Sequence, residues 1–86
     1  MYQIVLHRRA ARYFERLDAK LQAQLRAKLE ALQRDPLAMP RAKAMAGQWK
    51  GFYRMRHGDL RIIYTLNTSN RTVVVAHIGP RGDVYK

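Results

Sequence analysis

The sequence predicts an α+β domain in which two helices pack on one face of a mostly antiparallel sheet. Three observations lead to this fold class. A short alternating segment opens the chain, two segments with helical periodicity follow it, and the second half consists of strand-like runs separated by turn residues. The expected order is therefore β-α-α-β-β-β. A chain of 86 residues is expected to form a single domain, residues 1–86.

The first half of the chain is expected to supply one strand and a helical hairpin. Residues 2–6 alternate along the chain, which is typical of a short strand. The next apolar residues recur at helical spacing and form one stripe: Ala10, Tyr13, Phe14 and Leu17. Asp18 is the expected N-cap of a second helix. That helix has its own stripe: Leu21, Leu25, Leu29 and Leu32. Asp35-Pro36 ends it, because the residue before a proline disfavours helical backbone angles.

The second half of the chain is expected to form a three-stranded meander. Residues 36–48 contain two of the three prolines and show little periodicity, so we expect a loop there. The expected strands are residues 52–57, 60–66 and 72–78. Gly58-Asp59 joins the first two as a two-residue turn with glycine first, and residues 67–70 form a polar turn. Gly79-Pro80-Arg81-Gly82 is expected to end the last strand, before a short tail.

The turn at Gly58-Asp59 predicts how the strands on either side of it pair. A two-residue turn places His57 opposite Leu60, and the next pairs are Arg56/Arg61, Met55/Ile62, Arg54/Ile63 and Tyr53/Tyr64. Because side chains alternate across a sheet, one face is apolar and should meet the helices; it carries Tyr53, Met55, Leu60, Ile62 and Tyr64. The opposite face carries Phe52, Arg54, Arg56, Arg61, Ile63 and Thr65.

Three arginines on one face of two paired strands indicate an anion site. Like charges at opposed positions destabilise a sheet, and the rigid guanidinium fork of arginine matches the geometry of phosphate. The formal net charge of +11, from 17 Lys and Arg against 6 Asp and Glu, also indicates a polyanionic partner such as nucleic acid. The alternative is a solvated basic face whose side chains splay apart.

The composition excludes several other classes. The chain has no cysteine, which excludes disulfide scaffolds, thiol nucleophiles and cysteine-based zinc sites. Its three histidines, His7, His57 and His77, have no carboxylates at ligand spacing, so we expect no metal site and no cofactor. No apolar run is long enough to span a membrane, and no basic segment precedes the apolar N-terminus as in a signal peptide. We therefore expect a cytoplasmic protein.

Two segments resemble the RelE/ParE toxin superfamily. Residues 51–64, GFYRMRHGDLRIIY, are similar to its central signature, and residues 78–85, IGPRGDVY, are similar to its C-terminal motif. The two helices and Asp35-Pro36 agree with this resemblance. It implies the toxin of a type II toxin–antitoxin pair, neutralised in a hetero-oligomer by a cognate antitoxin. Such antitoxins wrap the toxin with an amphipathic helix, and an acidic segment would complement the positive charge.

Within the superfamily, the resemblance favours a RelE-like mRNA interferase, a ribosome-dependent endoribonuclease that cuts mRNA and inhibits translation. By motif, we expect the catalytic residues to be Arg54, Arg61, Arg81 and Tyr85. The expected RNA contacts are Arg56, Lys50, His77 and Phe52. Arg81 and Tyr85 enter through the resemblance alone. Some nucleases of the superfamily use a histidine, so His77 is also a candidate for proton transfer.

Cleavage without a metal would use the RNA 2′-hydroxyl as the nucleophile on its own phosphate, with arginines stabilising the charge on the phosphoryl oxygens. Tyr85 is the candidate base, although a tyrosine with a reference pKa of ~10 needs positive neighbours to serve at neutral pH. Such a site depends on a substrate held in line for attack, which is a reason to require a ribosome. The main alternative is a ParE-like inhibitor of DNA gyrase without nuclease activity. An inactive RNA-binding protein is the third possibility.

Overall fold

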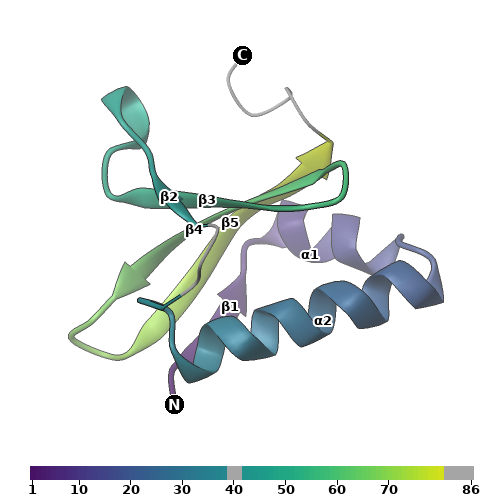
Figure 1. Ribbon diagram of the computed structural model, residues 1–86, viewed down its shortest axis with the longest axis horizontal. Coiled ribbons are helices and arrows are strands. Elements are labelled where there is room, and N and C mark those ends of the chain that lie inside the picture. Colours follow the sequence, from purple (N-terminus) through teal and green to yellow (C-terminus); the bar gives the residue numbers. More distant parts are fainter. Residues whose placement is uncertain (39–41, 81–86) are drawn as a thin grey trace.

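The computed structural model describes residues 1–38 and 42–80, and it confirms the α+β class. A five-stranded sheet in the order β1-β5-β4-β3-β2 carries both helices on one face (Figure 1). The strands are β1 (Gln3–Leu6), β2 (Lys43–Ala44), β3 (Phe52–His57), β4 (Leu60–Asn67) and β5 (Thr72–Pro80). The helices are α1 (Arg8–Glu15) and α2 (Ala19–Arg34). Of the four strand pairings described, β1–β5 is parallel and the other three are antiparallel, so the sheet is mostly antiparallel as expected.

Side-chain caps begin both helices. Asp18 caps α2 as predicted, because its Oδ1 accepts a hydrogen bond of 2.8 Å from the Leu21 amide. At the start of α1, Nδ1 of the exposed His7 accepts a longer bond of 3.4 Å from the Arg9 amide. α2 ends at Arg34, directly before Asp35-Pro36. His7 therefore acts as the cap of α1.

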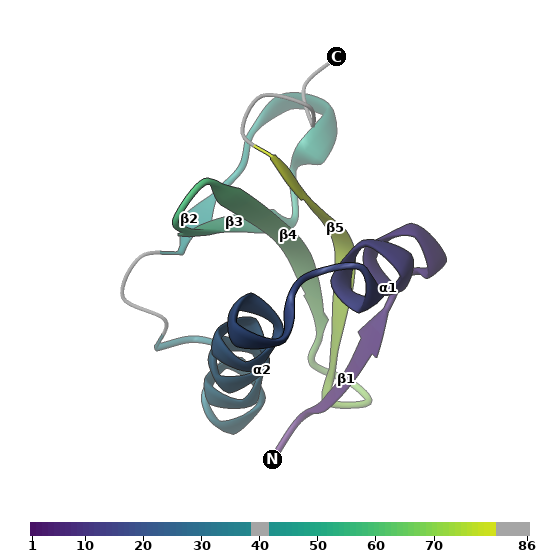
Figure 2. The ribbon, with the colours of Figure 1, turned by 90° about the vertical axis from the view of Figure 1, so that its right-hand side faces the viewer.

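The leucine stripe of α2 packs against the apolar face of the sheet. Leu25 and Leu32 are fully buried and Leu29 is nearly so. With Ala10 of α1, these leucines contact a layer of sheet residues: Met55, Leu60, Ile62, Tyr64, Val73, Val75 and Ile78. Viewed from the side, both helices lie on the same side of the twisted sheet (Figure 2). Burying one leucine side chain contributes about 1.5–3 kcal/mol, so this layer supplies a large share of the folding free energy.

The segment expected to be a loop, residues 36–48, contains two short elements. Lys43 and Ala44 form β2 and pair with Arg54 and Tyr53 of β3 at the edge of the sheet. A 3-10 helix, η1 (Gly47–Trp49), follows. The prediction of a loop is therefore wrong for this part of the chain. A strand of two residues is too short to show periodicity in the sequence. β2 forms because it pairs with the edge of β3, and not because its residues prefer a strand by themselves.

β5 continues through Gly79 and Pro80, where the sequence predicted its end. The prediction is wrong at these two residues, because it assumed that glycine and proline end a strand wherever they occur. β1 pairs with β5 as far as Val75, so one side of β5 is a sheet edge beyond that residue. A proline is tolerated at a strand edge, since no neighbouring strand there requires its missing N–H.

A β-bulge at Ala76 shifts the side-chain alternation of β5. Ile63 pairs with His77 whereas Tyr64 pairs with Val75, which leaves Ala76 as the extra residue. Strict alternation would have placed His77 on the same face as Val75, in the core. The bulge instead places His77 on the face opposite the helices.

Tyr64 provides a test of the core at alkaline pH. It is fully buried, its ring stacks on Tyr53 at a centroid distance of 5.6 Å, and its hydroxyl has no hydrogen-bond partner among the residues that the structure describes. Burial, with a smaller contribution from Tyr53, raises the pKa of Tyr64 to about 12. The unfolded chain loses this proton near pH ~10, so the associated stability is present below that pH and is lost as the pH rises through about 12.

We therefore expect Tyr64→Phe to become more stable relative to wild type as the pH rises through this window. Urea unfolding of both proteins from neutral to alkaline pH measures the difference. The comparison cancels the titration of the other tyrosines and lysines, which both proteins share. A difference that stays constant with pH would contradict the assignment.

Candidate functional site

The pairing predicted for β3 and β4 is confirmed at every position. Gly58 has a φ of 58°, as a two-residue turn with glycine first requires. The pairs are His57/Leu60, Arg56/Arg61, Met55/Ile62, Arg54/Ile63 and Tyr53/Tyr64. The sheet face turned away from the helices therefore carries the expected arginines. We call it the arginine face and define it by Lys43, Phe52, Arg54, Arg56, Arg61, Ile63, Thr65, His77 and Gly79.

Arg61 lies in the middle of the arginine face. It pairs with Arg56 of β3 on one side and with Gly79 of β5 on the other, and it is only 5% exposed. Burial removes hydration from the guanidinium and strengthens its interactions with neighbouring charges. A second arginine directly opposite adds repulsion. This costly arrangement concentrates positive potential at one point of the sheet.

Lysine and arginine side chains extend this positive potential across neighbouring strands. Arg54 is half-buried and Arg56 is exposed on β3. Lys43, which is also exposed, pairs with Arg54 and so lies on the same face. Lys43 could not be identified from the sequence, because its position on the face depends on the pairing of β2 with β3. The cations thus extend from β2 through β3 to β4.

His77 is also part of the arginine face. It pairs with Ile63 and is half-buried. Its imidazole covers Gly79, because a Cβ placed on Gly79 would lie 2.7 Å from Nε2 of His77. Gly79 is the strand partner of Arg61. The sequence left open whether His77 is a core residue or a neighbour of Arg61, and the structure places it on the side of Arg61.

Two aromatic residues lie at the start of β3. Phe52 packs edge-on against Trp49, with 5.2 Å between the ring centroids, and both side chains are half-buried. Lys50 is exposed in the turn between η1 and β3. Phe52 is thus on the predicted face, but part of its ring is used in packing. Arg81 and Tyr85, the remaining predicted catalytic residues, lie outside the described residues.

Other polar and basic residues support the fold. His57 lies beside the hairpin turn on the helix side, where its Nε2 is 3.1 Å from Oε1 of Gln24. Lys28 of α2 donates a hydrogen bond of 3.0 Å to the Arg56 carbonyl, which holds this end of β3 against the helix. The Arg26 guanidinium lies 5.5 Å from the centre of the Phe14 ring. The positive charge of the chain is therefore only partly concentrated on the arginine face.

The described part of the chain offers no cluster of metal ligands and no membrane-spanning helix. In residues 1–38 and 42–80, no group of three or more His, Cys, Asp or Glu side chains is arranged to hold a metal ion. None of the helices in these residues combines the length and the apolar character needed to cross a membrane.

Solved structures with the same fold include several toxins. A chain of the toxin–antitoxin complex RelBE2 from Mycobacterium tuberculosis matches with a TM-score of 0.79 at 23% identity, over 93% of this chain and 98% of that one. The YoeB/ParE toxin from Agrobacterium tumefaciens matches with a TM-score of 0.80 at 18% identity, over 92% and 98%. The intact E. coli RelBE toxin–antitoxin complex matches with a TM-score of 0.77 at 18% identity, over 93% and 96%. At these identities the likeness concerns the fold.

The sequence itself matches a family of toxins. No curated protein matches it significantly. Residues 4–85, however, match the family described as the ParE toxin of the type II toxin–antitoxin system parDE. This match covers both helices, the arginine face and all of the sheet except Gln3. The chain therefore belongs to the ParE family of type II toxin–antitoxin toxins, within the RelE/ParE superfamily.

Proposed function

We propose that this toxin is a RelE-like mRNA interferase, an endoribonuclease that cuts mRNA on the ribosome and thereby inhibits translation. The observation that supports this proposal is the position of Arg54, Arg56 and Arg61 on the sheet face opposite α1 and α2, with His77 beside Arg61. Arginines this close together repel one another on a solvated sheet, whereas a bound phosphodiester would pair with their guanidinium groups. The proposal includes two further points: residues 1–86 form a single domain, and the protein acts in the cytoplasm.

The proposed reaction uses the 2′-hydroxyl of the RNA. Its oxygen attacks the adjacent phosphorus and the bond from phosphorus to the 5′-oxygen breaks, which leaves a 2′,3′-cyclic phosphate and a 5′-hydroxyl end. The proton lost by the 2′-hydroxyl is balanced by the proton that the leaving 5′-oxygen gains. Arg54 and Arg61 stabilise the charge on the phosphoryl oxygens. Arg81 stabilises the leaving oxygen by charge alone, because a guanidinium keeps its proton. Tyr85 and His77 are the candidates for proton transfer.

The exposed cations have a different role in this proposal. Arg56 and Lys43 contact flanking phosphates and orient the strand, which is what phosphate contacts do in nucleic-acid complexes. Lys50 and Phe52 extend this RNA surface past the start of β3. The net charge of +11 also favours docking on ribosomal RNA. A cognate antitoxin is the expected protein partner, since two of the similar structures above are toxin–antitoxin complexes.

The test is to add the purified toxin to a translating extract and to map the 5′ ends of a reporter mRNA. Cuts within translated codons, lost when ribosomes are omitted, support the proposal. Supercoiling of a relaxed plasmid by DNA gyrase is measured in parallel and should proceed normally.

The family match favours a second candidate, inhibition of DNA gyrase without RNA cleavage, because the matched family is named for ParE toxins. Blocked supercoiling together with intact mRNA would support this candidate and overturn the nuclease. Intact mRNA and normal supercoiling would leave an inactive RNA-binding protein as the remaining alternative.

Gly79→Ala tests whether the position of the His77 imidazole matters. The new methyl group would meet Nε2 at 2.7 Å, so the imidazole has to move. We expect Gly79→Ala to lower the rate of single-turnover cleavage by about 10–100-fold. His77→Ala should lower it at least as much, because it removes a positioned acid or base altogether. Stability should change little, because the atom that yields is the end of a side chain and not backbone.

A double-mutant cycle provides the control. In the His77→Ala background the methyl group has nothing to displace, so Gly79→Ala should have little further effect on cleavage. Equal losses in both backgrounds would show that Gly79 acts through the strand and not through His77.

A further inference from the structure

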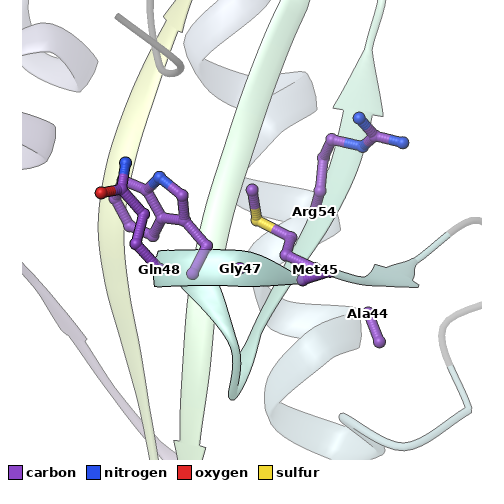
Figure 3. Close-up of a pocket in the computed structure, with 7 residues that line it drawn as sticks. Ala44, Met45, Gly47, Gln48 and Arg54 are labelled. Atoms are coloured by element: carbon purple, nitrogen blue, oxygen red, sulfur yellow. The ribbon is translucent and has the colours of Figure 1, made fainter.

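A pocket of about 520 Å³ lies beside Arg54, where β2 leads into η1. Residues 44–49 and Arg54 line it. In Figure 3 the side chains of Met45, Gln48 and Arg54 extend to the same side of the segment that carries Met45 and Gln48. The volume lies within the ~300–1,000 Å³ that is typical of small-ligand sites. The pocket is thus continuous with the arginine face through Arg54.

The wall of the pocket is held in place by backbone. The Met45 amide donates a hydrogen bond of 2.9 Å to the Phe52 carbonyl, which continues the pairing of β2 with β3. Gly47 and Gly51 have positive φ values of 67° and 94° and permit the tight turn of η1 between them. A pocket that is already formed needs little ordering when a ligand binds.

The chemistry of the lining is that of a base site. Met45 and Ala46 offer apolar surface, and the Gln48 amide offers both a donor and an acceptor. Trp49 contributes an indole whose buried Nε1–H has no hydrogen-bond partner in residues 1–38 and 42–80. Since Nε1 has almost no accessible surface, the part of the indole that a ligand in the pocket can contact is its aromatic ring. Proteins recognise single-stranded RNA by stacking its bases on aromatic and guanidinium groups and by hydrogen-bonding their edges.

We propose that this pocket binds one nucleobase of the RNA strand, adjacent to a phosphate attracted by the positive charge of Arg54. The choice of RNA as the ligand rests on the proposed function. Phosphate contacts carry no sequence information, whereas contacts to base edges do. The pocket therefore determines which base the toxin prefers, and the arginine face binds the phosphates of the RNA strand without regard to sequence.

Trp49 reports on the pocket directly, because it is the only tryptophan of the chain. We titrate the toxin with AMP, GMP, CMP and UMP, and with ribose 5-phosphate, which keeps the phosphate and lacks the base. At least one nucleotide should change the Trp49 fluorescence with an affinity about tenfold or more above that of ribose 5-phosphate, which corresponds to ~1.4 kcal/mol. Gln48→Ala should weaken that nucleotide several-fold, whereas Gln3→Ala, at an exposed glutamine of β1, should not.

The outcomes separate this proposal from the proposed function. An equal response to ribose 5-phosphate and to all four nucleotides overturns the base site and leaves mRNA cleavage unaffected. Base-dependent binding by a toxin that cuts no mRNA supports the base site and overturns the nuclease.

Cleavage in the extract gives a second readout. Ala46 has extended backbone angles, φ −121° and ψ 179°, which accept a large side chain, so Ala46→Phe should fill the pocket without unfolding the chain. We expect it to change the distribution of cuts among codons, whereas Ala23→Phe, at an exposed position of α2, leaves the distribution as in wild type. An unchanged distribution in Ala46→Phe would overturn the proposal that the pocket sets base preference.

Discussion

Arg61→Ala should lower single-turnover RNA cleavage by about 100-fold or more, the scale of losing one charged donor in a transition state. Arg61 is the most buried arginine described and is central on the arginine face, so water substitutes poorly for it. Its loss also removes the repulsion from Arg56, which lies directly opposite. Loss of this repulsion, about 0.2–1 kcal/mol for a cross-strand pair, offsets part of the packing that the buried side chain supplies, so we expect the free energy of unfolding to fall by no more than about 2 kcal/mol.

The expected signature is therefore a loss of activity that is much larger than the loss of stability. Single-turnover cleavage on programmed ribosomes and urea unfolding measure the two quantities. Arg12→Ala, which removes the same charge from an exposed position of α1, is the matched control and should cleave like wild type. Near-normal cleavage by Arg61→Ala would remove this residue from the proposed site. A large loss of stability would show that Arg61 acts mainly in the fold.

Leu25→Ala should give the largest loss of stability, about 2–5 kcal/mol. Leu25 is a fully buried residue of α2 that faces the sheet, in a core shared by both helices and four strands. The substitution leaves a cavity that the surrounding side chains fill only in part. A domain of this size has a total stability of about 5–15 kcal/mol, so the variant should unfold at a much lower urea concentration and close to physiological temperature.

Leu37→Ala is the matched control, because Leu37 is 73% exposed and the same atoms are removed. Its unfolding free energy should change by less than about 0.5 kcal/mol. Similar losses in the two variants would contradict the core described above. Because Leu25 packs on the helix side of the sheet and the arginine face lies on the opposite side, the activity of folded Leu25→Ala should remain close to wild type at low temperature.

Local rules predicted much of this fold. Asp18 and Asp35-Pro36 define the ends of α2 because capping and proline chemistry act over a few residues. The register of β3 and β4 follows from a single two-residue turn, since its geometry aligns all the residues on both sides. The side of the sheet on which Arg54, Arg56 and Arg61 lie was therefore predictable from the amino-acid sequence.

Three features of the site were not predictable in this way. β2 has only two residues and forms on the edge of β3, so Lys43 and the pocket beside Arg54 have no local pattern. The bulge at Ala76 reverses the alternation of β5 and moves His77 from the core face to the arginine face. The depth to which Arg61 is buried depends on its neighbours from β3 and β5.

The amino-acid sequence by itself determined the order of the two helices and the four longer strands, both ends of α2, the β3–β4 register and the concentration of arginines on one side of that hairpin. These depend on capping, periodicity and turn geometry, which act between residues close in the chain. Only the tertiary structure decided that His77 joins Arg61, that Lys43 extends the arginine face, and that residues 44–49 enclose a pocket with Arg54. Those placements depend on pairing between distant strands, where packing of the whole sheet, and not local preference, selects among registers.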